Sequence, residues 1–291
     1  MTLPRLILVF LLLASWAAGQ TTRPSRIIAL LPIGGEWGDK DNRFIPAEIV
    51  KDGWGVYLKR HLDPLIKAGV SRAALWTLYG RDAGLGMDFA GLDEVRKLGL
   101  RSRTHYGLPT ALKRYAGACQ VICYIGMPPS DGQWADRELH AGTPNAGRYF
   151  RFCDLQTQQI RDGRADVGLD VTSGISVNSM AWAWITYRRL SGETIIGEGW
   201  PEAKSTHLYD LPFFVTEGNL AQAQAGGFAA AKRAVLTGEI IVILQGPDGG
   251  ESWESDWEIR KAKKYLADGF SVCVPMSRQI GKGRLLADFG G

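Results

Sequence analysis

Three apolar segments of this chain end in an acidic residue, which would place carboxylates at one site if the segments are parallel strands. The acids are Asp170, Glu198 and Glu217, and a fourth, Asp248, follows the apolar segment 239–245. A lone ionised carboxylate is costly to bury, so each should face solvent, an ion partner or a substrate. Two such groups can cleave a glycosidic bond, one protonating the leaving group while the other attacks or activates water.

Eight short apolar segments alternate with helical stretches, and the acids lie at the ends of some of them. The strand-like segments are 26–33, 72–79, 120–127, 166–171, 194–198, 212–216, 239–245 and 271–275. The helical stretches are 55–68, 108–116, 152–160, 179–190, 227–236 and 257–267. This alternation predicts parallel strands joined by helical crossovers, and eight of them predict a single-domain (β/α)8 TIM barrel over residues 26–291.

A doubly wound open sheet is the alternative fold. Such a fold should have a glycine-rich phosphate-binding turn after its first strand, but residues 33–38 do not have the G-x-G-x-x-G pattern.

Glycines are expected to end several predicted helices, namely Gly69, Gly117, Gly163, Gly192, Gly238 and Gly269. The crossover 203–210 is too short for a full helix, and the insertion 128–147 is expected to form a loop over the barrel mouth.

In a TIM barrel the residues after each strand meet at one face, where active sites lie. Here they combine acids with aromatic and amide side chains, a mixture that suits sugars, whose apolar ring faces pack on tryptophan and whose hydroxyls bind carboxylates. We therefore expect catalysis by Asp170, Glu198, Glu217 and Asp248. The expected substrate-binding residues are Glu36, Trp37, Tyr79, Arg81, Asp82, Trp134, Trp200, Gln245 and Trp253.

The acid layout resembles that of the alpha-amylase superfamily of glycoside hydrolases. Asp170 follows the fourth strand, Glu198 in Ile-Gly-Glu-Gly-Trp follows the fifth, and Asp248 follows the seventh. The resemblance implies a nucleophile at Asp170, a general acid/base at Glu198 and a transition-state-stabilising acid at Asp248. That family has Arg two residues before the nucleophile, where this chain has Gly168.

Each acid also has a structural alternative. Asp170 could cap the following loop, Glu217 could form an ion pair, and Asp248 with Glu251 could cap the helix that follows. Trp182 and Trp184 lie inside a predicted helix and are expected in the core.

Two other functions stay open at this point, a non-catalytic carbohydrate-binding barrel and a metal-dependent lyase or isomerase. The metal ligands in that case would be Asp170, Glu198 and Glu217. The leading hypothesis needs no cofactor and no metal. Its partner is an oligo- or polysaccharide.

Residues 1–19 have a basic start, an apolar run and small residues, which predict a secretory signal peptide and a secreted or periplasmic protein. The apolar run is shorter than the ~20 residues of a spanning helix, and retention of the uncleaved segment as an anchor is the alternative. The net charge of +4 gives no reason to expect nucleic acid as a partner. Oligomeric state is left open.

Export permits disulfides, and the chain has four cysteines, Cys119, Cys123, Cys153 and Cys273. Their apolar surroundings favour packing as small hydrophobic residues. A Cys119–Cys153 bridge is the alternative. The four histidines are dispersed and do not have the spacing of a zinc site.

Overall fold

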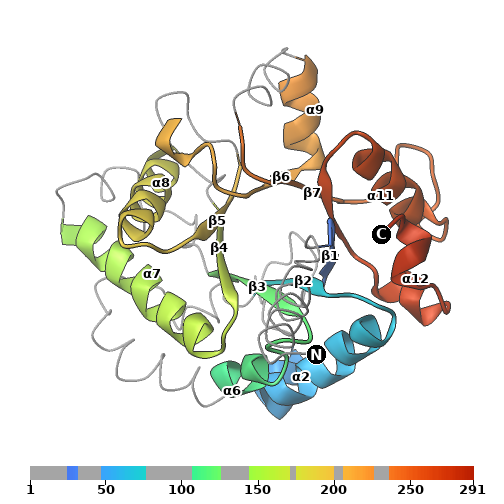
Figure 1. The fold of residues 1–291 in the computed structure, drawn as a ribbon, viewed down its shortest axis with the longest axis horizontal. Coiled ribbons are helices and arrows are strands. Elements are labelled where there is room, and N and C mark those ends of the chain that lie inside the picture. The colour runs from blue at the N-terminus through green and yellow to red at the C-terminus, as the bar shows by residue number, and fades with distance from the viewer. Residues whose placement is uncertain are drawn as a thin grey trace, which may run out of the picture.

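The computed structural model describes residues 25–31, 47–76, 107–125, 144–170, 175–199, 206–225 and 236–291. Its eight parallel strands pair in chain order and close into a barrel, with β1 hydrogen-bonded to both β2 and β8 (Figure 1). The strands are β1 (Ile27–Leu30), β2 (Arg72–Trp76), β3 (Gln120–Ile125), β4 (Asp166–Asp170), β5 (Ile195–Glu198), β6 (Phe213–Thr216), β7 (Ile240–Ile243) and β8 (Ser271–Val274). The predicted (β/α)8 barrel is confirmed, and the open sheet is excluded.

Helices surround the ring of strands (Figure 1). They are α2 (Ala47–Lys67), α6 (Leu108–Lys113), α7 (Pro144–Asp162), α8 (Ile175–Leu190), α9 (Glu217–Ala225), α11 (Trp257–Ala267) and α12 (Ser277–Gly281). The 3₁₀ turns are η3 (Thr206–Leu208) and η4 (Leu286–Phe289). Between β5 and β6 the described residues form only η3, as the short crossover predicted. The predicted helix at 227–236 and the insertion loop lie almost wholly outside the described residues.

Alternation along the strands divides the core into two clusters. Residues pointing into the barrel form one, which is Ile28, Ala74, Ile122, Tyr124, Ile196, Phe214, Ile241, Ile243 and Cys273. The other lies between the strands and the helices and includes Trp182 and Trp184, which are 4% and 0% exposed. The expectation that both tryptophans pack in the core is confirmed.

None of the described helices is both long and apolar enough to cross a membrane.

Four of the six predicted glycine stops have the left-handed backbone that closes a helix, with φ between +82° and +98°: Gly69, Gly117, Gly192 and Gly269. At the end of α7 the left-handed residue is instead Arg164, with φ +58°. Position 163 requires a glycine for another reason, because a Cβ there would lie 2.8 Å from the Leu112 side chain. Gly238 likewise allows close approach, since its Cβ would lie 1.9 Å from the Leu211 carbonyl oxygen.

All four cysteines are buried free thiols. Burial raises the pKa of Cys119 to about 12, and it raises the pKa of Cys123 and Cys273 further. The cysteines are therefore packed as small hydrophobic side chains in the structure, and the Cys119–Cys153 bridge is absent from it.

Candidate functional site

The structure describes part of the predicted mouth. Glu198, Glu217, Gln245, Asp248 and Trp253 are described with their side chains, and Asp170 by its backbone at the end of β4. The other predicted substrate-binding residues lie outside the described residues, and they are Glu36, Trp37, Tyr79, Arg81, Asp82, Trp134 and Trp200.

Asp170 and Glu198 are the last residues of neighbouring strands, and their Cα atoms are partners in the β4–β5 register. Adjacent strands lie about 4.8 Å apart, so the backbone brings these two positions as close as a sheet allows. Glu198 is only 6% exposed. Gly199 then takes φ +120°, so the chain turns away directly after the acid.

Two aromatic rings lie inside the barrel near the position of Glu198. Phe214 is the register partner of Glu198 on β6, and its ring meets that of Tyr124 edge to face, with centroids 5.2 Å apart. Both residues are fully buried. Phe214 and Tyr124 thus form an aromatic layer of the barrel interior.

Gly168 allows this layer to form. It is the register partner of Tyr124, and a Cβ at Gly168 would lie 3.3 Å from the Tyr124 ring. The alpha-amylase layout has Arg at this position, and here the tyrosine ring takes the adjacent space.

The alternation of side chains along β5 shows which way Glu198 faces. Ile196, two residues before Glu198, belongs to the cluster inside the barrel, so Glu198 also faces the lumen.

Glu217 begins α9 directly after β6, and polar groups hold both of its carboxylate oxygens. Lys261 Nζ lies 2.9 Å from Oε1 and 3.1 Å from Oε2. The backbone N–H of Gln245 donates to Oε2 at 2.8 Å, and the Tyr265 hydroxyl donates to Oε1 at 3.2 Å. These contacts fit the ion-pair alternative for Glu217, with a lysine as the cation.

Asp248 shares the same lysine. Lys261 Nζ lies 3.1 Å from Asp248 Oδ1, and Arg260 donates to Oδ2 at 3.1 Å. Hydrogen bonds from Lys261 and Arg260 lower the pKa of Asp248, whose side chain is 63% exposed. Asp248 and Glu251 contact α11 through these cations, while Asp256 is the residue at the N-cap of α11.

Sequence analysis did not identify Lys261 as part of the mouth. It is 6% exposed and also donates to the Gly246 carbonyl oxygen at 2.6 Å. Burial alone would lower the pKa of Lys261, but the hydrogen bonds to Glu217 and Asp248 raise it. One signal was present, because Trp257, Lys261 and Tyr265 recur every four residues and thus share the inner face of α11.

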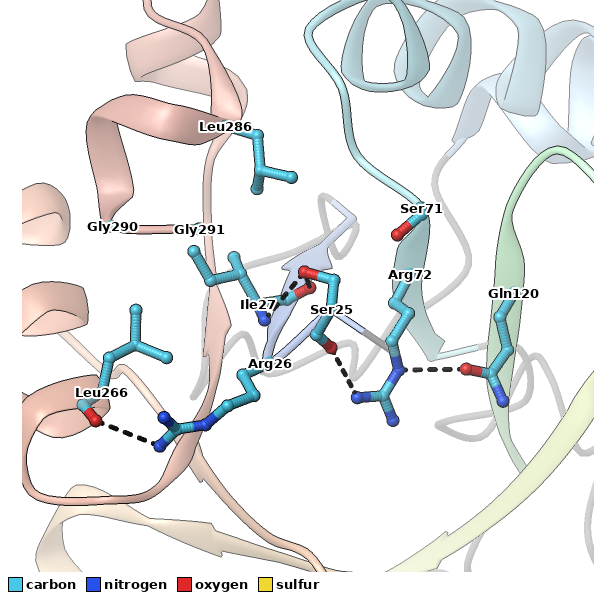
Figure 2. A pocket seen from close by; sticks show the side chains of 10 residues that line it. All are labelled: Ser25, Arg26, Ile27, Ser71, Arg72, Gln120, Leu266, Leu286, Gly290 and Gly291. Carbon is cyan, nitrogen blue, oxygen red and sulfur yellow. Dashed lines mark hydrogen bonds between the residues drawn. The ribbon is translucent and has the colours of Figure 1, made fainter. Parts of the chain in front are cut away.

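The opposite end of the barrel is closed by a polar network that sequence analysis also missed. Arg72 donates to both Glu239 oxygens at 2.7 and 2.9 Å, to Gln120 at 3.0 Å and to the Ser25 carbonyl at 2.8 Å. A cavity of about 590 Å³ opens beside it (Figure 2). Figure 2 also shows Arg26 reaching the Leu266 carbonyl oxygen. The donors of Arg72 are thus directed to protein acceptors, which is typical of the stability face of a barrel.

The part of the chain that the structure describes does not contain a complete set of metal ligands. No group of three or more His, Cys, Asp or Glu side chains is placed there to hold an ion. Because the Asp170 side chain is not among those described, this finding concerns the remaining acids.

The closed parallel barrel defines this chain as a TIM-barrel protein. No protein-family model and no curated protein matches it. A solved structure with a similar fold is phospho-2-dehydro-3-deoxyheptonate aldolase from Thermotoga maritima, at 16% identity over 87% of this chain and 73% of that chain, with a TM-score of 0.32. A truncated 3-deoxy-D-arabino-heptulosonate 7-phosphate synthase from the same organism shares 15% identity over 87% and 92% of the chains, with a TM-score of 0.31. Likeness at this level carries no argument about activity.

Proposed function

We propose that this protein is an exported glycoside hydrolase in which Asp170 and Glu198 are the reacting carboxyl groups. The observation that supports the proposal most is the pairing of Asp170 with Glu198 at the ends of adjacent barrel strands, with Glu198 6% exposed. A TIM barrel carries its chemistry at this end, and glycosidic cleavage needs two carboxyls close together. The sequence of residues 1–19 supports export.

Glu198 is the proton donor in this proposal. Its side chain is largely removed from water, since Glu198 is only 6% exposed. Removal from water favours the neutral form of a carboxyl group, which is the form that protonates a leaving oxygen.

Asp170 is the nucleophile. Its oxygen bonds to the anomeric carbon as the glycosidic C–O bond breaks, and the proton of Glu198 goes to the departing oxygen. Glu198, now ionised, removes a proton from water, whose oxygen displaces Asp170 and frees the sugar. A retaining course needs the two carboxyl groups about 5–5.5 Å apart, whereas an inverting one needs about 6.5–9.5 Å.

Glu217 and Asp248 act as supports of the mouth in this proposal. Lys261 holds a carboxylate oxygen of each and the Gly246 carbonyl, which joins the start of α9 to the loop after β7. The hydrogen bonds that lower the pKa of Asp248 make it a poor proton donor.

The test is a screen of the purified mature chain against chromogenic glycosides and polysaccharides. Asp170→Asn and Glu198→Gln should each lower kcat on the substrate found by about 10²-fold or more, because each removes a reacting group. Asp162→Asn is the matched control, since Asp162 is exposed at the end of α7, and the kcat of this variant should equal that of the wild type.

The screen has three outcomes that would overturn the proposal. Activity within about tenfold of the wild type in both variants would remove the carboxyls from the chemistry. Glycan binding without turnover would make the barrel a binding module. Loss of activity on chelator treatment would favour a metal-dependent lyase or isomerase. NMR of the first-formed anomer decides between retention and inversion.

A further inference from the structure

Trp253 stands out on the loop that follows β7. It is 64% exposed, whereas Trp54, Trp182, Trp184 and Trp257, the other tryptophans whose side chains the structure describes, are at most 4% exposed. Its exposed ring face is available to a ligand from solvent.

The indole ring is held in place from two sides. A Cβ at Gly246 would lie 3.0 Å from Trp253 Cη2, so the ring edge rests directly on the backbone of the loop. The ring also meets Trp257 at 88°, with centroids 5.9 Å apart. Trp257 is itself buried, and Lys261 Nζ lies 5.8 Å from its ring.

The loop that carries Trp253 is tied to α11 by charged groups. Arg260 binds both Asp248 and Glu251, and the Ser255 hydroxyl donates to Glu251 at 2.9 Å. Lys261 holds Asp248 from the buried side. A ring fixed in this way loses little freedom when a ligand packs on it, so more of the contact energy goes into affinity.

The groups around the ring favour a sugar as its occupant. Ser252 and Glu254 flank Trp253 in the chain and are exposed, and the side chain of Gln245 is exposed at the end of β7. Protein partners select broader apolar patches. A pyranose ring instead presents an apolar face to an indole and hydroxyls to carboxylate and amide groups around it.

We propose that Trp253 is a stacking platform for a pyranose unit of an oligo- or polysaccharide, at a subsite beside the reacting pair. This inference rests on the proposed function. Trp253 lies on the loop between β7 and α11, whereas Glu198 ends β5, and β6 separates these two strands in the barrel, so in this proposal the platform engages a sugar unit other than the one at Glu198. The substrate is therefore a chain of several sugars and not a single glycoside.

The experiment measures binding of cellohexaose, xylohexaose, mannohexaose and chitohexaose by calorimetry, in the wild type and in the Glu198→Gln background. Trp253→Ala should weaken the affinity for whichever hexasaccharide binds by about tenfold or more. Trp253→Phe should lose less affinity, because it keeps an aromatic face. Tyr187→Ala is the matched control, because Tyr187 is 46% exposed but lies on α8. In the active background, Trp253→Ala should raise KM for the hexasaccharide and leave kcat/KM for a short aryl glycoside unchanged.

The outcomes separate this inference from the proposed function. Binding that depends on Trp253 without any turnover would support the platform and overturn hydrolysis. Turnover and binding that are equal in the wild type and Trp253→Ala would overturn the platform and leave hydrolysis standing. Absence of hexasaccharide binding to the wild type would overturn the platform as well. So would a change of oligomeric state in Trp253→Ala with no effect on sugars, which would make the ring a protein contact.

Discussion

Gly197 shows how the absence of a side chain allows close aromatic packing beside the proposed proton donor. A Cβ at Gly197 would lie 2.8 Å from Cη2 of Trp182 and 3.4 Å from the Phe213 ring. Both aromatic residues are buried, so neither can move away without disturbing the core. The glycine before Glu198 is thus required by packing on the outer face of β5, whereas the glycine after it is required by the backbone.

We expect Gly197→Ala to lower the free energy of unfolding by about 1–3 kcal/mol, because the added methyl overpacks Trp182. Gly249→Ala is the control, since a Cβ there meets nothing within 4 Å, and it should change stability by less than about 0.5 kcal/mol. Urea denaturation measures both. Equal stabilities of the two variants would contradict the packing argument.

At the scale of elements, buried ion pairs join segments that are distant in the chain. Lys261 connects α11 to the start of α9 and to the loop after β7. Arg72 and Glu239 connect the beginning of β2 to the residue before β7, 167 positions away. Lys261 and Arg72 are 6% and 5% exposed, so the loss of a partner in the Lys261–Glu217 or Arg72–Glu239 pair leaves a charge in a poorly hydrated place.

Lys261→Met should destabilise the protein by about 3 kcal/mol, because Glu217 loses the cation that binds both of its oxygens. The same substitution at the exposed Lys263 of α11 should cost less than about 0.5 kcal/mol. If Lys261→Met unfolds at the same denaturant concentration as Lys263→Met, the support role assigned to the lysine is wrong.

Glu239 predicts a pH dependence. Burial alone would raise its pKa, but the hydrogen bonds and charge of Arg72, with Ser271, lower it below the ordinary value of 4.5. The folded state therefore gains stability from ionised Glu239 above about pH 4.5, and this gain is lost as the pH falls through the lowered pKa.

Glu239→Gln should accordingly cost about 3 kcal/mol at pH 7 and progressively less below pH 4.5. Urea unfolding of variant and wild type across the acid range measures the difference. The exposed Asp162→Asn serves as control and should show a small, nearly constant effect. A Glu239→Gln cost that grows as the pH falls would contradict the sign derived from Arg72.

At the scale of the whole molecule, the barrel buries its cysteine thiols. Cys119 is 6% exposed, and Cys123, Cys153 and Cys273 are fully buried. A disulfide reagent should react slowly with the native protein and label four thiols once guanidinium unfolds it. Only two labelled thiols in the unfolded, unreduced chain would show that one disulfide forms.

The architecture was predictable from the chain because its signals are local. Apolar segments of strand length, helical periodicity between them and glycine at most helix ends all act within a few residues, and all eight strands agree with their predicted segments. The acids at the ends of β4 and β5 follow from the same pattern. Their pairing follows from the closure of parallel strands in chain order.

The contacts that define the site required the tertiary structure. Sequence could not show that one lysine joins Glu217 to Asp248, or that Gly168 admits the Tyr124 ring, because Lys261 is 44 positions from Glu217 and Gly168 lies on a different strand from Tyr124. Nor could it choose between packing and a bridge for Cys119 and Cys153. Local sequence determines which elements form and where their polar ends lie, since backbone preferences act over short range. Which side chains then meet depends on long-range packing, and only the closed barrel decides it.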